Sequence, residues 1–191
     1  PMFDQLKTAS EASGQAYIAL PSSGSYAEWT IRNDEGGAGV TMRFTMPDSS
    51  DGMGLDGSLD VYVNGTKAQT VPLTSYYNYQ YFAVGGGHPS DAPGGGNPLF
   101  RFDETHWKLA TPLQAGDVIR IEKSNSDNLE YGVDFLEIES VPSPISRPGN
   151  AIAVTDFGAI ANDGMDDLAA FNQAVDAAVA NGQPLYIPPG T

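Results

Sequence analysis

The sequence predicts a mainly β protein, with a β-sandwich first and the opening of a second kind of β fold after it. Three observations support this. In residues 1–141, apolar and polar side chains alternate over several short runs that Gly-rich or polar turns separate. Residues 142–150 are rich in proline and show no periodicity, and residues 151–191 combine two short strands with a helical pattern. We therefore expect a β-sandwich domain over 1–141, a linker over 142–150 and a separate unit over 151–191.

The first strands show period-two alternation, which marks strands that are buried on one face. Residues 25–31, SYAEWTI, and residues 39–46, GVTMRFTM, both alternate in this way. Residues 59–73, LDVYVNGTKAQTVPL, indicate a hairpin. Their central Asn64-Gly65 pair suits the positive φ angles of a two-residue turn.

The later strands follow at similar spacing. Residues 76–82, YYNYQYF, predict a strand of high aromatic density, and GDVIRIEK (116–123) and YGVDFLEIE (131–139) predict two more. Short strands with polar turns between them favour an all-β sandwich. Residues 84–98, VGGGHPSDAPGGGNP, predict a long loop within it.

The last segment mixes strand and helix signals. Asp166 can cap a helix, and Asn181-Gly182 is a typical helix end. Between them an apolar stripe recurs at helical spacing. Its members are Leu168, Phe171, Val175, Ala178 and Val179. Residues 184–191, PLYIPPGT, predict a strand that runs into a turn.

The composition excludes some classes of partner. The formal net charge is −15, which argues against nucleic acid and against an anionic membrane surface, because both require clustered Lys and Arg. The sequence contains no cysteine, so disulfides do not hold the fold together. No apolar run approaches the roughly 18 residues of a membrane span. We expect neither nucleic acid nor a membrane as a partner.

Residues 154–191, VTDFGAIANDGMDDLAAFNQAVDAAVANGQPLYIPPGT, resemble the opening segment of the right-handed parallel β-helix in pectin-lyase-like polysaccharide enzymes. The shared pattern is a strand that ends in D-F-G-A, then N-D-G, a D-D helix start, and a strand that leads to I-P-P-G-T. The resemblance implies that the helix caps the N-terminal end of the β-helix. It also implies that the chain is truncated just as the solenoid begins, so that the β-helix catalytic domain is an expected partner.

Residues 8–141 resemble a carbohydrate-binding module of the family 35 and family 6 type. The likeness lies in SEASGQAYIALPSSGSYAEWTI, MRFTMPD, LDVYVNG, LTSYYNYQYF, FDETHW and YGVDFLEIESV. These residues are still more similar to the β-sandwich module that precedes the β-helix in bacterial α-1,3-glucanases (mycodextranases, glycoside hydrolase family 87). The resemblance implies a jelly-roll-like module in a secreted, extracellular bacterial protein whose partner is a glucan.

Asp134 is the candidate metal ligand with the most specific pattern. By alternation it shares a strand face with Leu136 and Ile138, and an inward carboxylate needs a cation, an arginine or backbone donors. In the resembled modules an aspartate here ligates a structural Ca²⁺, helped by an E-x-E strand. Nothing before Glu11 matches that strand, and Asp134 and Glu11 are the candidate Ca²⁺ ligands. Family 6 modules also often carry a sugar-binding Asn where Gly132 stands here.

Two groups of residues are candidates for sugar binding, because sugars stack apolar ring faces on aromatic side chains and offer hydroxyls to polar groups. Tyr77 and Tyr79 lie on one face of the predicted aromatic strand. Trp107 and His106 lie beside Glu104 in FDETHW. The alternative is that these rings pack inside the sandwich or at its interface with the β-helix.

Catalysis by a glycoside hydrolase needs two carboxyl groups at a defined separation. Asp156, Asp163, Asp166 and Asp167 suit the turn and the helix start instead. In the resembled β-helix enzymes the catalytic carboxylates lie on later coils, so we expect no catalytic residue here.

The leading hypothesis is a non-catalytic glycan-binding or structural part of a secreted β-helix glycoside hydrolase that acts on α-1,3-glucan. One alternative is the same architecture in a polysaccharide lyase or a β-1,3-glucanase. Another is a structural or adhesin module without sugar affinity.

Overall fold

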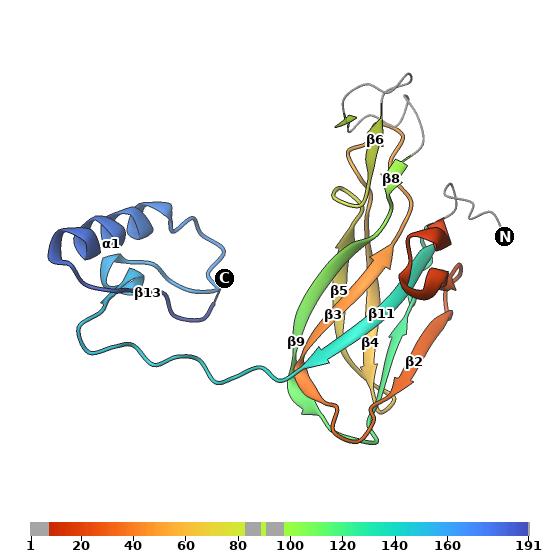
Figure 1. Ribbon diagram of the computed structural model, residues 1–191, viewed down its shortest axis with the longest axis horizontal. Helices are drawn as coiled ribbons and strands as arrows, with labels where there is room; N and C mark the ends of the chain where they lie inside the picture. Colours follow the sequence, from red (N-terminus) through yellow and green to blue (C-terminus); the bar gives the residue numbers. More distant parts are fainter. Residues whose placement is uncertain (1–7, 83–88, 91–97, 191) are drawn as a thin grey trace. The chain divides into compact units, whose positions relative to one another are not determined.

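The computed structural model describes residues 8–82, 89–90 and 98–190. The chain divides into two compact units, Pro1–Val141 and Pro142–Thr191 (Figure 1).

The first unit is built on two four-stranded antiparallel sheets. One sheet has the order β1 (Ile18–Leu20), β11 (Tyr131–Glu139), β3 (Gly37–Thr45) and β9 (Asp103–Leu113). The other has the order β2 (Tyr26–Thr30), β10 (Val118–Glu122), β4 (Asp56–Val63) and β5 (Thr66–Thr74). The prediction of a mainly β chain with antiparallel sheets is confirmed.

Smaller elements complete this unit. A three-stranded antiparallel sheet has the order β7 (Pro89–Ser90), β6 (Gln80–Phe82) and β8 (Pro98–Phe100). Two short 3₁₀ helices, η1 (Thr8–Ser10) and η2 (Ser13–Gln15), precede β1.

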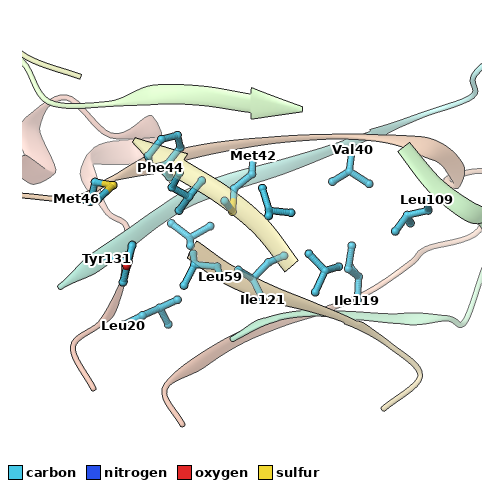
Figure 2. Packing of buried hydrophobic residues seen from close by; sticks show 14 of the residues in the cluster. Leu20, Val40, Met42, Phe44, Met46, Leu59, Leu109, Ile119, Ile121 and Tyr131 are labelled. Atoms are coloured by element: carbon cyan, nitrogen blue, oxygen red, sulfur yellow. The ribbon is translucent and has the colours of Figure 1, made fainter. Parts of the chain in front are cut away.

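The hydrophobic core lies between the two large sheets. Val40, Met42 and Phe44 of β3 are almost completely buried, as their alternation predicts. Leu59 and Ile121 meet them from the other sheet, and Figure 2 shows the side chains of both sheets gathered into one cluster. Packing between the two inner faces is therefore the main source of stability in this unit.

The predicted hairpin at Asn64-Gly65 is also present. Both residues have positive φ angles, 50° and 79°, and the β4–β5 register closes at Val63 opposite Thr66. A short polar residue and a glycine tolerate these angles at low cost, which explains why this dipeptide occupies the turn.

The aromatic run 76–82 differs from its prediction as one strand. Only Gln80–Phe82 forms a strand, because the Asn78 N–H donates to the Ser75 carbonyl at 3.0 Å and closes a turn. Most of the predicted loop 84–98 lies outside the described residues, and its described parts, 89–90 and 98, belong to strands.

The second unit pairs two short parallel strands, β12 (Ile152–Ala153) and β13 (Leu185–Tyr186). Between them the chain forms the 3₁₀ helix η4 (Val154–Phe157) and the helix α1 (Leu168–Asn181). The helix ends as predicted, with Gly182 in the left-handed conformation at φ 62°. None of the described helices is long and apolar enough to cross a membrane.

The buried face of α1 follows the predicted apolar stripe only in part: Ala178 is buried and Phe171 packs against the core of this unit, but the other members are exposed. The helix buries its small residues Ala170, Ala174 and Ala178, while Leu168 and Val179 are 61% and 78% exposed. Alanine lets a helix approach a short strand pair closely, so the small side chains rather than the large ones define the contact.

Candidate functional site

A hollow in the first unit is lined largely by aromatic side chains and includes residues of β6 and β8. Figure 1 shows where these two strands lie in the first unit. The volume of the hollow is about 520 Å³, and we call it the aromatic hollow. The lining residues are Gly52, Met53, Tyr76, Tyr77, Tyr79, Gln80, Phe100 and Phe102. Among the described residues this lining contains no charged side chain.

Three separate segments supply the exposed part of the hollow. Met53 comes from the loop before β4, Tyr76 and Tyr77 from the turn after β5, and Phe100 from the end of β8. Tyr77 is 73% exposed and Phe100 is 56% exposed. The rings of Tyr76 and Tyr77 meet edge to face, with centroids 4.8 Å apart.

Hydrogen bonds hold the side chains of Tyr79 and Tyr81 in place. The Tyr79 hydroxyl donates to the Met46 carbonyl, and the Tyr81 hydroxyl donates to Asp48 Oδ2, both at 2.7 Å. Their two rings stack 6.0 Å apart. Burial raises the pKa of both tyrosines, and the Asp48 carboxylate raises that of Tyr81 further. Both hydroxyls therefore stay protonated and keep donating.

Of the predicted sugar-binding residues, Tyr77 and Tyr79 line this hollow together. Trp107, His106 and Glu104 do not. Trp107 of β9 packs against the hydrophobic core, whereas His106 and Glu104 are exposed on the alternate positions of the strand. Trp107 Nε1 is buried and has no hydrogen-bond partner within the described part of the chain.

Asp134 lies at a β-bulge, where the β11–β3 register shifts between Val133 and Phe135. The prediction that Asp134 shares the face of Leu136 and Ile138 is therefore wrong. Those two residues pack against the core, but Asp134 bonds to Arg43. A bulge inserts an extra residue and re-aims the side chain, which simple alternation cannot anticipate.

Each candidate calcium ligand has an arginine partner. Arg43 Nη1 donates to Asp134 Oδ2 at 2.7 Å, and the Ser13 N–H lies 2.9 Å from both Asp134 oxygens. Arg101 forms an ion pair with Glu11. Burial raises the pKa of the Glu11 carboxyl group, although the charge of Arg101 opposes this rise. We call these four charged residues the arginine–carboxylate cluster. The structure therefore shows the arginine and backbone donors that the sequence indicated as the alternative to a cation at Asp134.

A guanidinium group occupies one oxygen of each candidate carboxylate: Arg43 bonds Asp134 Oδ2, and Arg101 pairs with Glu11 Oε1. Within the described residues no group of three or more His, Cys, Asp or Glu side chains could hold a metal ion. Calcium binding itself stays a prediction.

Gly132 explains a departure from the resembled modules. A Cβ atom at this position would lie 2.6 Å from Thr45 Cγ2 and from a ring carbon of Tyr17. An asparagine at this position therefore requires the Thr45 or Tyr17 side chain to shift.

The four acids that precede α1 in the second unit have local structural partners. Asp156 accepts two hydrogen bonds from Arg147, at 2.8 and 2.6 Å. Asp163 and Asp166 accept the N–H groups of Met165 and Leu168, and Asp167 accepts that of Ile160. Arg147, from the predicted linker, also donates to the Ala151 carbonyl, so this part of 142–150 is tied to the second unit.

The first unit is thus a two-sheet antiparallel β domain with an aromatic hollow, an architecture that hosts many functions. The family model described as "Alpha-1,3-glucanase catalytic domain D1" matches residues 1–141. The chain belongs to this family. A search among curated proteins found no match.

Solved structures give the same result over the whole chain. The crystal structure of the Agl-KA catalytic domain is 73% identical with a TM-score of 0.94, and the match covers 98% of this chain and 32% of that one. The catalytic unit of the thermostable GH87 α-1,3-glucanase from Streptomyces thermodiastaticus strain HF3-3 is 31% identical with a TM-score of 0.76. That match covers 100% of this chain and 32% of the other. A GH87 catalytic domain crystallised with nigerose, at 22% identity and a TM-score of 0.75, shares the fold.

These findings correct the predicted function. The chain was expected to be a non-catalytic binding or structural part, but the family model and the solved structures are of α-1,3-glucanase catalytic domains. The expected α-1,3-glucan target fits them. The error has a physical reason: a β-sandwich hosts many functions, so likeness to a binding module does not establish a binding role.

Proposed function

We propose that this chain acts as part of a secreted, extracellular glycoside hydrolase that cleaves α-1,3-glucan. The family match over residues 1–141 carries the proposal. The 73% and 31% identity to GH87-type catalytic domains supports it. The chain spans 32% of the length of both, so activity belongs to the whole enzyme. Related domains have been crystallised with nigerose and with tetrasaccharides, as expected for an enzyme that holds several sugars.

The proposed architecture is a jelly-roll-like sandwich over 1–141, a linker over 142–150 and the opening of a right-handed parallel β-helix over 151–191. The parallel pair β12–β13, with α1 in the connection between the strands, supports the last part, because parallel strands require such a crossover. The exposed Leu168 and Val179 of α1 are then available to further coils of the same enzyme.

The reaction class is tested by product analysis. The complete enzyme is incubated with insoluble α-1,3-glucan, with β-1,3-glucan and with pectin. We expect reducing sugars from α-1,3-glucan and little from the other two. Release from β-1,3-glucan alone would identify a β-1,3-glucanase, and unsaturated products from pectin would identify a lyase. Either outcome overturns the proposal.

A further inference from the structure

We infer that the aromatic hollow is a binding site for the neutral glucan chain. The ligand class rests on the proposed function, whereas the site rests on the residues of the first unit. The volume of about 520 Å³ lies within the range of roughly 300–1,000 Å³ that is usual for small-ligand sites. It admits a short stretch of a sugar chain.

The exposed rings gather in one place. Single exposed apolar side chains are common on any protein and carry no meaning, but a contiguous group does. Met53, Tyr77 and Phe100 are 63%, 73% and 56% exposed and line the same hollow from different segments. Exposed apolar surface of this kind is costly in water and is covered when a sugar ring stacks on it.

The hollow is also built to hold its shape. Gly54 has a φ of 79°, and a Cβ there would lie 2.5 Å from the Tyr76 backbone nitrogen. Only glycine lets the loop of Gly52 and Met53 approach the tyrosine turn this closely. This close approach and the hydrogen bond of the Tyr79 hydroxyl hold the Tyr79 ring and the backbone of the tyrosine turn in place. A pre-formed site loses little conformational entropy when a ligand binds.

Charge determines which polysaccharide suits the site. Among the described residues the lining contains no charged side chain, and the chain has a net charge of −15. An acidic polysaccharide such as pectin is repelled by that charge, whereas an uncharged glucan is not. Tyrosine rings offer a face for stacking, and the Gln80 amide can bond to sugar hydroxyls.

The experiment measures depletion of the intact enzyme from a suspension of insoluble α-1,3-glucan. Tyr77→Ala and Phe100→Ala should each weaken binding by about 5- to 100-fold, by analogy with aromatic stacking on other flat ligands. Tyr77→Phe should bind nearly as well as the wild type, because it keeps the ring. Tyr26→Ala is the matched control, since Tyr26 is 51% exposed on β2 and does not line the hollow.

Thermal melts of all variants are the folding control. We expect Tm values close to that of the wild type, because the substituted rings of Tyr77 and Phe100 are exposed and contribute little to the core. Wild-type affinity in Tyr77→Ala and Phe100→Ala, or an equal loss in Tyr26→Ala, overturns the inference. Tighter binding of the wild type to pectin than to glucan overturns the choice of ligand. If the wild type releases sugar from α-1,3-glucan and the variants bind normally, only the hollow is rejected. If the wild type releases none, the proposed function fails, and the binding assay still tests the hollow.

Discussion

Replacing Arg43 by methionine removes the cation that faces the Asp134 carboxylate. The Asp134 side chain is fully buried, and that of Arg43 is 26% exposed. Arg43 also donates to the Glu11 carbonyl at 3.1 Å and lies 4.9 Å above the Phe102 ring. Methionine keeps part of the packing on that ring but supplies neither the charge nor the donors.

The magnitude follows from what remains around Asp134. Removing one member of a buried ion pair costs about 3–5 kcal/mol, because the other charge stays buried without its partner. The Ser13 N–H still lies 2.9 Å from both Asp134 oxygens and retains part of the compensation. We therefore expect a loss of about 2–3 kcal/mol, which in a chain of this size lowers Tm by about 5–10 °C.

The assay is a thermal melt at neutral pH with two further variants. Arg43→Met combined with Asp134→Asn should recover at least half of the loss, because the uncompensated charge is gone. Arg120→Met is the control: Arg120 pairs with Glu28 at the surface, where an ion pair contributes about 1 kcal/mol or less. If Arg43→Met melts no lower than Arg120→Met, the reasoning is refuted.

The same melts test the calcium prediction. With chelator and then with added Ca²⁺, a rise in the Tm of the wild type would show that the ion binds despite the arginines. A rise confined to Arg43→Met would show that the guanidinium occupies the position of the cation. Ligand binding to the folded state alone raises Tm by mass action.

Three further predictions concern the first unit. Burial opposes ionisation of Asp127, but hydrogen bonds from Tyr131 and Lys123 outweigh it and hold its pKa below the ordinary value. The stabilisation from the ionised Asp127 carboxylate is fully present above the pKa that this group has in the unfolded chain, and it is lost as pH falls through its pKa in the folded chain. Between about pH 7 and about pH 3, the Tm of the wild type should therefore fall more steeply with pH than the Tm of Asp127→Asn. Burial and Asp127 raise the pKa of Tyr131 from 10.0 to about 12, so stability should also fall as pH rises across that interval. For Trp107→Ala, core contact predicts a loss of about 2–4 kcal/mol with glucan binding retained in the folded protein. Lost binding at an unchanged melt would instead support a sugar contact at Trp107.

Local patterns predicted the backbone of the first unit well. Alternation in β3 and the Asn64-Gly65 turn are properties of a few neighbouring residues, and they act the same way in any two-sheet context. The aromatic hollow could be predicted only in part. Tyr77 and Tyr79 stand out in the sequence as part of an aromatic run. Nothing in the sequence near Met53 or Phe100 indicates that these residues line the same hollow as the two tyrosines.

The sequence by itself determined the hairpin, the acidic net charge and most strands of the two large sheets, namely β2, β3, β4, β5, β10 and β11, because each depends on neighbouring residues or on composition. It gave no indication of β1 and β9. Only the tertiary structure decided that a bulge turns Asp134 toward Arg43, and that alanines rather than leucine and valine form the buried face of α1. It also brought Met53, Tyr77 and Phe100 into one hollow. These three outcomes have one physical reason. The partners of a side chain depend on which distant segments pack together, and a local periodic pattern contains no information about packing between distant segments.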